Sequence, residues 1–212
     1  MMATVDDAHR TQPLIAVDVV PVAFDGDSLL VGTAARRFEP FAGQQALPGV
    51  LLGSAELLDD AAGRALADKA DIHAPRTLVQ LGAFDRPGRD PRSHAISIAF
   101  LAVTDPAAGT AQWTQPDELP ALPFDHRSIV AAALDVARIR LWRDTDLTRA
   151  LLGETFTTRD ASRLELVITG RPADPGNMHR QLTKDSRLRQ SQHTLPSGRG
   201  RPAAVWTWTE RA

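Results

Sequence analysis

Residues 46–72, ALPGVLLGSAELLDDAAGRALADKADI, restrict the fold more than any other part of this 212-residue chain. Pro48 and Gly49 form a turn signal, and the segment 55–70 that follows has the pattern of a helix. Apolar segments separated by turns lie on both sides of this unit, as is typical of strands. We therefore expect a mixed α+β protein.

Four longer strands are expected around this helix. Segments 14–24 and 28–35 flank Asp25-Gly26-Asp27, which is a hairpin signal. Segments 77–84 and 94–103 are expected to be strands on either side of a loop of Gly, Pro and charged residues.

A second helix is expected to close the first part of the fold. Trp113 is placed in a short strand, and Asp125 is expected to cap the helix that follows. Apolar residues then recur near helical spacing at Ile129, Ala132, Ala133, Val136 and Ile139. A domain boundary is expected between 142 and 153, and the remaining sixty or so residues are too few for a large core. They should dock on the first domain or on a partner chain.

The composition excludes several classes of protein. With no cysteine, the chain can have neither disulfides, nor thiolate catalysis, nor cysteine-ligated zinc. It has no run of 18 apolar residues, and its N-terminus lacks the pattern of a signal peptide. These features predict a soluble, cytoplasmic protein that makes no contact with a membrane.

The net charge of −2 hides a difference between the two parts of the chain. Residues 1–150 contain 14 Lys/Arg and 20 Asp/Glu, whereas residues 151–212 contain 10 and 6. An acidic body with a basic C-terminal part is a common arrangement in proteins that contact nucleic acid. Chance clustering of charges is the alternative interpretation.

The C-terminal part is expected to begin with two helices. Thr157 and Asp160 have the spacing of a capping box, and Gly170 is placed to end the first helix. Asp174 and Pro175 then form the start of a second helix. Met178 and Leu182 share its apolar side, and four polar residues can face outward: Asn177, His179, Arg180 and Lys184.

A hairpin follows these helices, with a basic, glycine-rich turn at 195–202 before the alternating segment 203–208. Two helices and a hairpin are the outline of a winged helix-turn-helix, whose second helix would enter the major groove of double-stranded DNA. Asn177, His179, Arg180 and Lys184 are then candidates for DNA contact, together with Arg199 and Arg201 at the wing. The alternative is a small α/β cap that only packs on the first domain.

The segment 46–72 resembles the Nudix signature, G-x5-E-x7-R-E-U-x-E-E-x-G-U, in which U is a bulky aliphatic residue. The Leu-Pro-Gly that usually precedes it is present, and Glu56 and Arg64 match. Leu66 and Ile72 fill the aliphatic positions. Five residues depart from the usual pattern: Val50, Gly53, Ala65, Lys69 and Asp71. The resemblance implies a Nudix-type mixed sheet sandwiched by helices.

The departures bear on catalysis. Pyrophosphate hydrolysis needs a divalent metal, which in turn needs several carboxylate oxygens. The three carboxylate positions after Arg64 hold Ala65, Asp68 and Lys69, which are expected to share one helix face. A unit charge pair about 4 Å apart interacts by about 4 kcal/mol at an effective dielectric of 20, so Lys69 beside a divalent ion would cost about twice that. We expect neither a metal site, nor catalytic residues, nor a cofactor.

Phosphate recognition can survive the loss of a metal because arginines and backbone amides bind phosphate directly. Candidates are Arg36 and Arg37 after the second strand, and Arg86, Arg89 and Arg92 in the loop 85–93. We expect Arg36, Arg37, Arg89, Arg92 and the matching Glu56 to contribute to ligand binding. The alternative for any single arginine is a solvated surface residue.

Beyond its first dozen residues, the chain resembles the Nudix-related transcriptional regulators of NAD metabolism, the NrtR family. The resemblance rests on five segments: 39–49, 88–93, 124–134, 177–182 and 198–206. It implies a homodimeric repressor of NAD-biosynthesis genes that binds operator DNA and is released when an ADP-ribose-like nucleotide binds the Nudix domain.

The expected organisation is a loose segment at 1–12, a ligand-sensing domain at 13–143 and a winged helix-turn-helix domain at 153–212.

Two rival functions stay open. One is a slow ADP-ribose hydrolase whose metal ligands come from elsewhere, such as Asp59, Asp60 or Asp90. The other is a winged-helix regulator of a different pathway.

Overall fold

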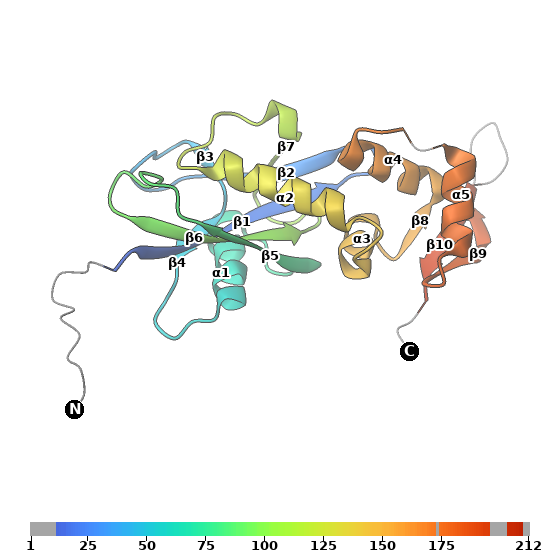
Figure 1. Ribbon diagram of the computed structural model, residues 1–212, viewed down its shortest axis with the longest axis horizontal. Helices are drawn as coiled ribbons and strands as arrows, with labels where there is room; N and C mark the ends of the chain where they lie inside the picture. The colour runs from blue at the N-terminus through green and yellow to red at the C-terminus, as the bar shows by residue number, and fades with distance from the viewer. Residues whose placement is uncertain (1–11, 173, 196–202, 210–212) are drawn as a thin grey trace.

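The computed structural model describes residues 12–172, 174–195 and 203–209, and places a mixed sheet at one end of an elongated molecule (Figure 1). The central strand β1 is antiparallel to β2 and parallel to β6. The order along the sheet is β3-β2-β1-β6-β5, while β4 pairs with β1 and β7 pairs with β2. The strands are β1 (Leu14–Phe24), β2 (Leu29–Ala35), β3 (Gln45–Ala46), β4 (Gly49–Leu51), β5 (Thr77–Phe84), β6 (Ala95–Val103) and β7 (Gln112–Thr114).

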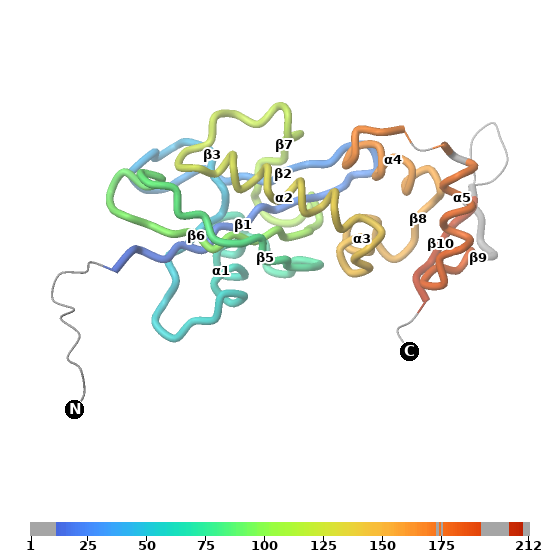
Figure 2. The backbone as a smooth tube through the Cα atoms, viewed as in Figure 1, coloured from blue at the N-terminus to red at the C-terminus, as the bar shows by residue number. Residues whose placement is uncertain are grey.

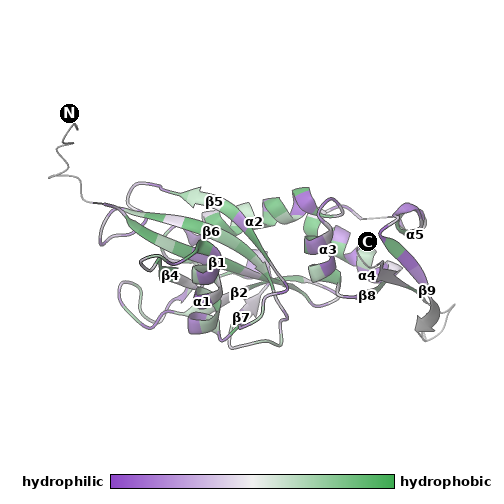
Figure 3. Cartoon of the chain, turned by 90° about the horizontal axis from the view of Figure 1, so that it is seen from below, coloured by the Kyte–Doolittle hydropathy of each residue, from purple (hydrophilic) through white to green (hydrophobic). Residues whose placement is uncertain are grey.

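Helices cover both faces of this sheet, and hydrophobic residues run along β1 and β6 between them (Figure 3). On one face lies α1 (Leu58–Ala70), whose Ala61, Ala65 and Leu66 pack against β1 and β6. On the other face lie α2 (His126–Arg140) and α3 (Thr145–Leu152). Because both faces are covered, β1 is buried continuously from Val17 to Ala23. The expected mixed fold is confirmed.

One helix start and one helix cap differ from the expectation. Helix α1 begins at Leu58 rather than at 55, because the Glu56 carboxylate accepts the N–H of Gly53 and holds a turn in front of the helix. Asp125 lies at the N-cap position of α2 as expected, but its side chain caps no backbone N–H. Its carboxylate instead accepts a hydrogen bond from Arg89.

The buried face of α2 is rotated from the expected one. Ile129, Val130, Ala133 and Ala137 are buried, whereas Ile139 is 62% exposed. Ala133, Ala137 and Leu141 are spaced four residues apart and turn the same side of the helix to the core, whereas Ile139 lies on the opposite side.

The C-terminal part has the order and caps that the sequence predicts for a winged helix. Thr157 and Asp160 form a capping box, Gly170 ends α4 in the left-handed conformation, and the Asp174 carboxylate accepts the N–H of Asn177. The three strands pair in the order β8-β10-β9. The elements are β8 (Thr155–Thr157), α4 (Thr158–Thr169), α5 (Pro175–Lys184), β9 (Leu188–Leu195) and β10 (Ala203–Trp208).

This module has a small core of its own and also joins the large one. Met178 and Leu182 of α5 pack with Trp206, as the apolar side of the predicted helix requires. Leu164 and Ile168 of α4 belong instead to the core that α2 and α3 form on the sheet. The tube in Figure 2 shows α3 and α4 between the sheet and the helix α5. Docking of the C-terminal residues on the first part of the chain is therefore confirmed, while the domain limits at 143 and 153 stay predictions.

Polar contacts reinforce this attachment at the end of α2. The Trp142 indole Nε1 donates to Glu165 of α4 at 3.1 Å, and Arg187 donates to the Trp142 carbonyl oxygen at 2.9 Å. Arg163 of α4 donates to the Asp27 carbonyl oxygen in the β1–β2 turn at 2.6 Å.

In the described parts of the chain, no helix is both long and apolar enough to span a bilayer.

Candidate nucleotide site and DNA-contacting surface

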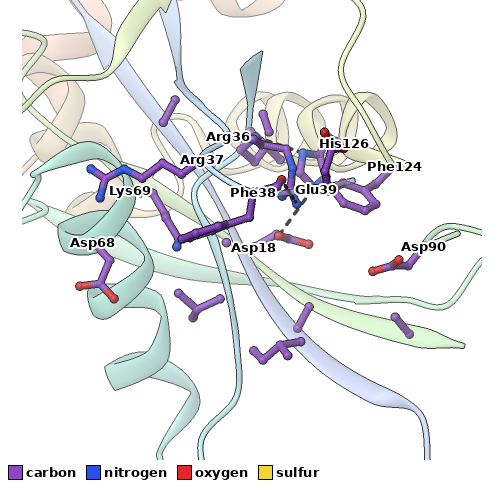
Figure 4. A pocket seen from close by; sticks show the side chains of 18 of the residues that line it. Asp18, Arg36, Arg37, Phe38, Glu39, Asp68, Lys69, Asp90, Phe124 and His126 are labelled. Carbon is purple, nitrogen blue, oxygen red and sulfur yellow. Dashed lines mark hydrogen bonds and ion pairs between the residues drawn. The ribbon is translucent and has the colours of Figure 1, made fainter. Parts of the chain in front are cut away.

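A cavity of about 450 Å³ opens on the sheet between α1 and the N-terminus of α2. Its walls come from β1, β4, the segment after β2, and the loop before β6 (Figure 4). This volume suits a small-molecule ligand. The charged and aromatic residues that line it are Asp18, Arg36, Arg37, Phe38, Glu39, Arg64, Asp68, Lys69, Arg89, Asp90, Arg92, Phe124 and His126.

The floor of the cavity is a buried polar network around Arg89. Its guanidinium donates to Asp18 at 3.1 Å and to Asp125 at 3.0 Å, and all three side chains are less than a tenth exposed. Ser97 donates a further hydrogen bond to Asp18 at 2.6 Å. One cation thus neutralises two carboxylates only in part, so the floor keeps an excess of negative charge. Arg89 is committed to the scaffold rather than held free for a ligand.

His126 completes this floor in its neutral form. Its Nδ1 accepts the backbone N–H of Leu47 at 3.1 Å, so this nitrogen carries no proton. Its Nε2 lies 3.7 Å from Asp18 Oδ1. Burial lowers the pKa of His126 below its ordinary value. The histidine therefore links the Leu-Pro-Gly turn to the buried network.

The glycine of the Leu-Pro-Gly turn is required by this packing. A Cβ on Gly49 would lie 2.1 Å from Asp18 Oδ1, which is far inside van der Waals contact. Any other residue at 49 would displace the buried carboxylate and the arginine bound to it. Retention of this part of the box thus has a structural cause that does not depend on catalysis.

Two arginines of the cavity are held in different ways. Arg92 forms a two-point ion pair with Asp90, at 2.7 and 3.0 Å, and this hydrogen bonding lowers the pKa of Asp90. Arg36 lies 4.8 Å from the centre of the Phe124 ring and donates to the Pro40 carbonyl oxygen at 2.8 Å. Burial lowers the pKa of Arg36, and the nearby Arg92 adds to this effect. Of the two, Arg36 keeps a positive charge without a carboxylate bound to it.

The mouth of the cavity carries cations that make no such pair. Arg37 and Lys69 line it, and within the described part of the chain neither side chain forms an ion pair or a hydrogen bond. Phe38 stands beside them and is 70% exposed (Figure 4). Two free cations and an exposed ring are suitable for an anionic ligand with a flat ring system.

Glu56 lies outside the cavity lining and binds Arg64 instead. The two side chains form a bidentate pair at 2.7 and 2.8 Å, and Arg64 also donates to the Leu51 carbonyl oxygen at 2.9 Å. The hydrogen bonds from Arg64 and from the Gly53 N–H lower the pKa of Glu56 to about 2. The two matching residues of the box thus fix the turn in front of α1.

The box positions on α1 do not provide a metal site of the kind that Nudix catalysis needs. Of the three positions after Arg64, Ala65 is fully buried against the sheet, while Asp68 and Lys69 reach the cavity. The positions keep their i, i+3 and i+4 spacing within α1, so the helix face that they share brings one carboxylate to the cavity. Among the residues that the structure describes, no cluster of three or more His, Asp or Glu side chains is placed to hold a metal ion. A methyl group and an ammonium group are not metal ligands, so these residues do not fit a divalent ion.

A second surface lies on α5, at the end of the molecule away from the cavity (Figure 1). Asn177, His179, Arg180 and Lys184 are exposed on it, as the sequence predicts. Arg180 donates to the Asn177 amide oxygen at 2.6 Å, and the His179 ring contacts Trp206 edge-on. Arg199 and Arg201 lie outside the described residues.

Several residues that line the cavity were not predicted as ligand-binding residues, among them Asp18, Phe38, Lys69, Phe124 and His126. Asp18 gave a usable signal, because a carboxylate inside a strongly apolar strand needs a buried partner. His126 and Phe124 gave none, since a histidine at a helix start is commonly solvated. Arg86 was named with the loop arginines, but it does not line the cavity.

The sheet, its helices and the box-bearing α1 define a Nudix domain, and a winged helix follows it in the same chain. The chain is 32% identical over 125 residues to the ADP-ribose pyrophosphatase of Methanocaldococcus jannaschii. This alignment covers 56% of this chain and 71% of that protein. The chain belongs to the Nudix family. No family model matches the chain.

Solved structures extend the likeness to the whole fold. NrtR of Shewanella oneidensis, solved in complex with a 27-mer DNA, aligns with a TM-score of 0.78 at 23% identity over 92% of this chain and 93% of that one. The Nudix domain of the same protein, solved with ADP-ribose, aligns over 63% of this chain with a TM-score of 0.54 at 23% identity. A MutT/nudix family protein from Enterococcus faecalis aligns over 95% of this chain and 88% of that one, with a TM-score of 0.75 at 21% identity.

Proposed function

We propose that the protein is a cytoplasmic, dimeric repressor of NAD-biosynthesis or salvage genes that releases its operator when ADP-ribose or a related nucleotide binds the cavity. The observation that carries this proposal is the presence, in one chain, of a cation-lined cavity and an exposed polar helix on a winged-helix module. Among the solved structures that resemble this chain, one of NrtR contains DNA and one of its Nudix domain contains ADP-ribose.

The residues suit these two ligands. Arg36, Arg37 and Lys69 offer positive charge to a diphosphate, and Phe38 offers a ring for stacking. On α5, Asn177 and Arg180 carry the groups that pair with adenine and guanine edges in the major groove. Arg89, Arg92 and Glu56 contribute by fixing the walls, because each is bound to charged partners within the protein.

The proposal is tested by titrating labelled DNA from upstream of the chain's own gene and of NAD-biosynthesis genes, with and without ADP-ribose. We expect sequence-specific binding that ADP-ribose weakens. Linkage requires that DNA weaken ADP-ribose binding by the same factor. Equal ADP-ribose affinity by calorimetry with and without bound operator would contradict the coupling. Specific binding only to promoters of other genes would favour the regulator of a different pathway.

A dimer is part of the proposal because one small module makes few base contacts, and two half-sites about one helical turn apart double them. Sedimentation of the protein alone and with operator measures this. A monomer at micromolar concentration that binds its operator one to one would contradict it.

The rival function is hydrolysis, which the name of the ADP-ribose pyrophosphatase relative favours. We propose that this chain has no such activity at ordinary enzyme rates, because Ala65 is buried and Lys69 occupies a carboxylate position. Release of AMP from ADP-ribose is measured with Mg²⁺ or Mn²⁺. Turnover of about 1 per second or faster would establish an enzyme instead.

A further inference from the structure

We propose that the Lys69 ammonium group, together with the Arg37 guanidinium, binds the diphosphate of the effector directly and so replaces a divalent metal ion in ligand binding. This inference rests on the proposed nucleotide effector and adds a prediction about its recognition: binding needs no metal. Lys69 stands where the Nudix signature has a carboxylate, and that carboxylate is one of those expected to hold the metal.

The first argument is the availability of these two cations. Three other cations of the cavity are bound to carboxylates: Arg64 to Glu56, Arg89 to Asp18 and Asp125, and Arg92 to Asp90. Arg37 and Lys69 make no ion pair in the described part of the chain. The nearest box carboxylate, Asp68, is 3.9 Å from Arg64 Nη1, so it faces that arginine. The charge of Lys69 is therefore open to a ligand.

The second argument is position. Lys69 lies in the last turn of α1 and Arg37 in the segment after β2, so the two reach the cavity from different elements (Figure 4). Lys69 is half-buried, which shields its charge from solvent more than on an open surface. Cations that approach from two sides suit a diphosphate, because each can contact a different phosphoryl group.

The third argument is the charge balance of the lining. Three cations that line the cavity have no carboxylate bound to them: Arg36, Arg37 and Lys69. A diphosphate that links two sugars carries two negative charges at neutral pH. The cations without a carboxylate can therefore compensate this ligand without an added ion.

The experiment compares three probes by calorimetry, each in EDTA and in Mg²⁺: ADP-ribose, inorganic pyrophosphate and adenosine. For the wild type we expect ADP-ribose to bind with the same affinity in both media. We expect Lys69→Gln to weaken ADP-ribose and pyrophosphate about 10- to 100-fold, since it removes one charge-assisted contact, and to leave adenosine unchanged. Arg37→Gln should act in the same direction.

Matched variants exclude general effects of charge or folding. Lys69→Arg keeps the charge and should retain most of the affinity. Arg138→Gln removes an exposed cation from the far end of α2 and should leave affinity unchanged. Thermal unfolding of each variant verifies the fold.

The outcomes separate this inference from the proposed function. Unchanged ADP-ribose affinity in Lys69→Gln, or an affinity that rises severalfold with Mg²⁺, would overturn the inference while leaving a nucleotide effector intact. Lys69-dependent binding of pyrophosphate without any binding of ADP-ribose would support the cationic site and refute the proposed effector.

Discussion

The cavity floor and the exposed face of α5 differ in the partners of their charged side chains. At the floor, Arg89 is buried with two carboxylates bound to its guanidinium. On α5, Arg180 is exposed, and its one side-chain hydrogen bond among the described residues goes to the Asn177 amide oxygen. Lys184 makes no ion pair with any residue that the structure describes. Charges bound inside the protein hold it together, whereas charges without a carboxylate partner are the ones available to an outside anion.

The same rule divides the arginines within the cavity. Arg64, Arg89 and Arg92 belong with the structural charges, while Arg36, Arg37 and Lys69 belong with the available ones. Residue type alone therefore does not identify a phosphate-binding cation. The partner that each side chain already has decides it.

The largest expected effect comes from breaking the buried network. Arg89→Met would leave Asp18 and Asp125 buried without a cation, and we expect it to lower the free energy of unfolding by about 3–5 kcal/mol. Urea denaturation of the purified variant measures this loss. Exposed ion pairs contribute less than about 1 kcal/mol. A loss within that range would show that Arg89 does not stabilise the fold as a buried charge.

Removing an available charge should leave stability unchanged and weaken DNA binding. If Arg180 contacts a base edge, Arg180→Ala should cost about 1–3 kcal/mol of operator affinity and relax the preference at one position. Competition with single-base operator variants measures both effects. Arg138→Ala on α2 is the control for the loss of a charge.

Arg199 and Arg201 give a contrasting signature if they contact phosphate. Their replacement should weaken all sequences alike and lower the salt dependence by about one unit each. Unchanged operator binding and salt slope in the Arg180, Arg199 and Arg201 triple alanine variant would leave α5 and the wing without a role in DNA contact.

The neutral His126 predicts that the contribution of the cavity floor to the free energy of unfolding depends on pH. Its folded pKa lies below the ordinary value, so its contribution to stability is present above about pH 6.5 and is lost as pH falls below it. Between pH 7.5 and 5.5 the wild type should lose more of its free energy of unfolding than His126→Gln, which keeps an acceptor for the Leu47 N–H. Equal losses in urea titrations at both pH values would show that His126 is not the titrating group.

The smallest effect on ligand binding is expected from a substitution in the turn in front of α1. Glu56 is bound to Arg64 and lies outside the cavity lining, so Glu56→Gln should leave ADP-ribose affinity unchanged. Since the pKa of Glu56 is lowered to about 2, its pairing stabilises the fold above pH 4.5 and is lost as pH falls toward 2. A clear loss of ADP-ribose affinity would instead show that Glu56 contributes to ligand binding, as the sequence predicted.

Local sequence signals predicted most of the elements, because caps and turns act within a few residues. The box of Thr157 and Asp160, the Gly170 cap and the Asp174 cap all lie where their spacing placed them. The start of α1 was predicted three residues early, since the bond from Gly53 to Glu56 cannot be read from helix propensity.

The cavity was harder to predict, because its partners are distant in the sequence. Asp18 and Arg89 are 71 residues apart, and Leu47 and His126 are 79 apart. A list of arginines gives candidates for phosphate contact, but only the fold shows that Arg89 and Arg92 already have partners. Similarly, the helix spacing of Ala65 and Lys69 did not show that one of them is buried against the sheet.

Helix α2 extends from the cavity to the C-terminal module. His126 at its first turn lies in the cavity floor, and Trp142 just beyond its end holds Glu165 and Arg187 of the C-terminal module. Its 15 residues span about 22 Å, so a tilt of about 5° at the cavity would displace the far end by about 2 Å. In a two-fold dimer this displacement would act on both reading helices, whose separation must match half-sites about 34 Å apart. A small movement of one histidine-bearing helix end would then become a mismatch in spacing along the DNA.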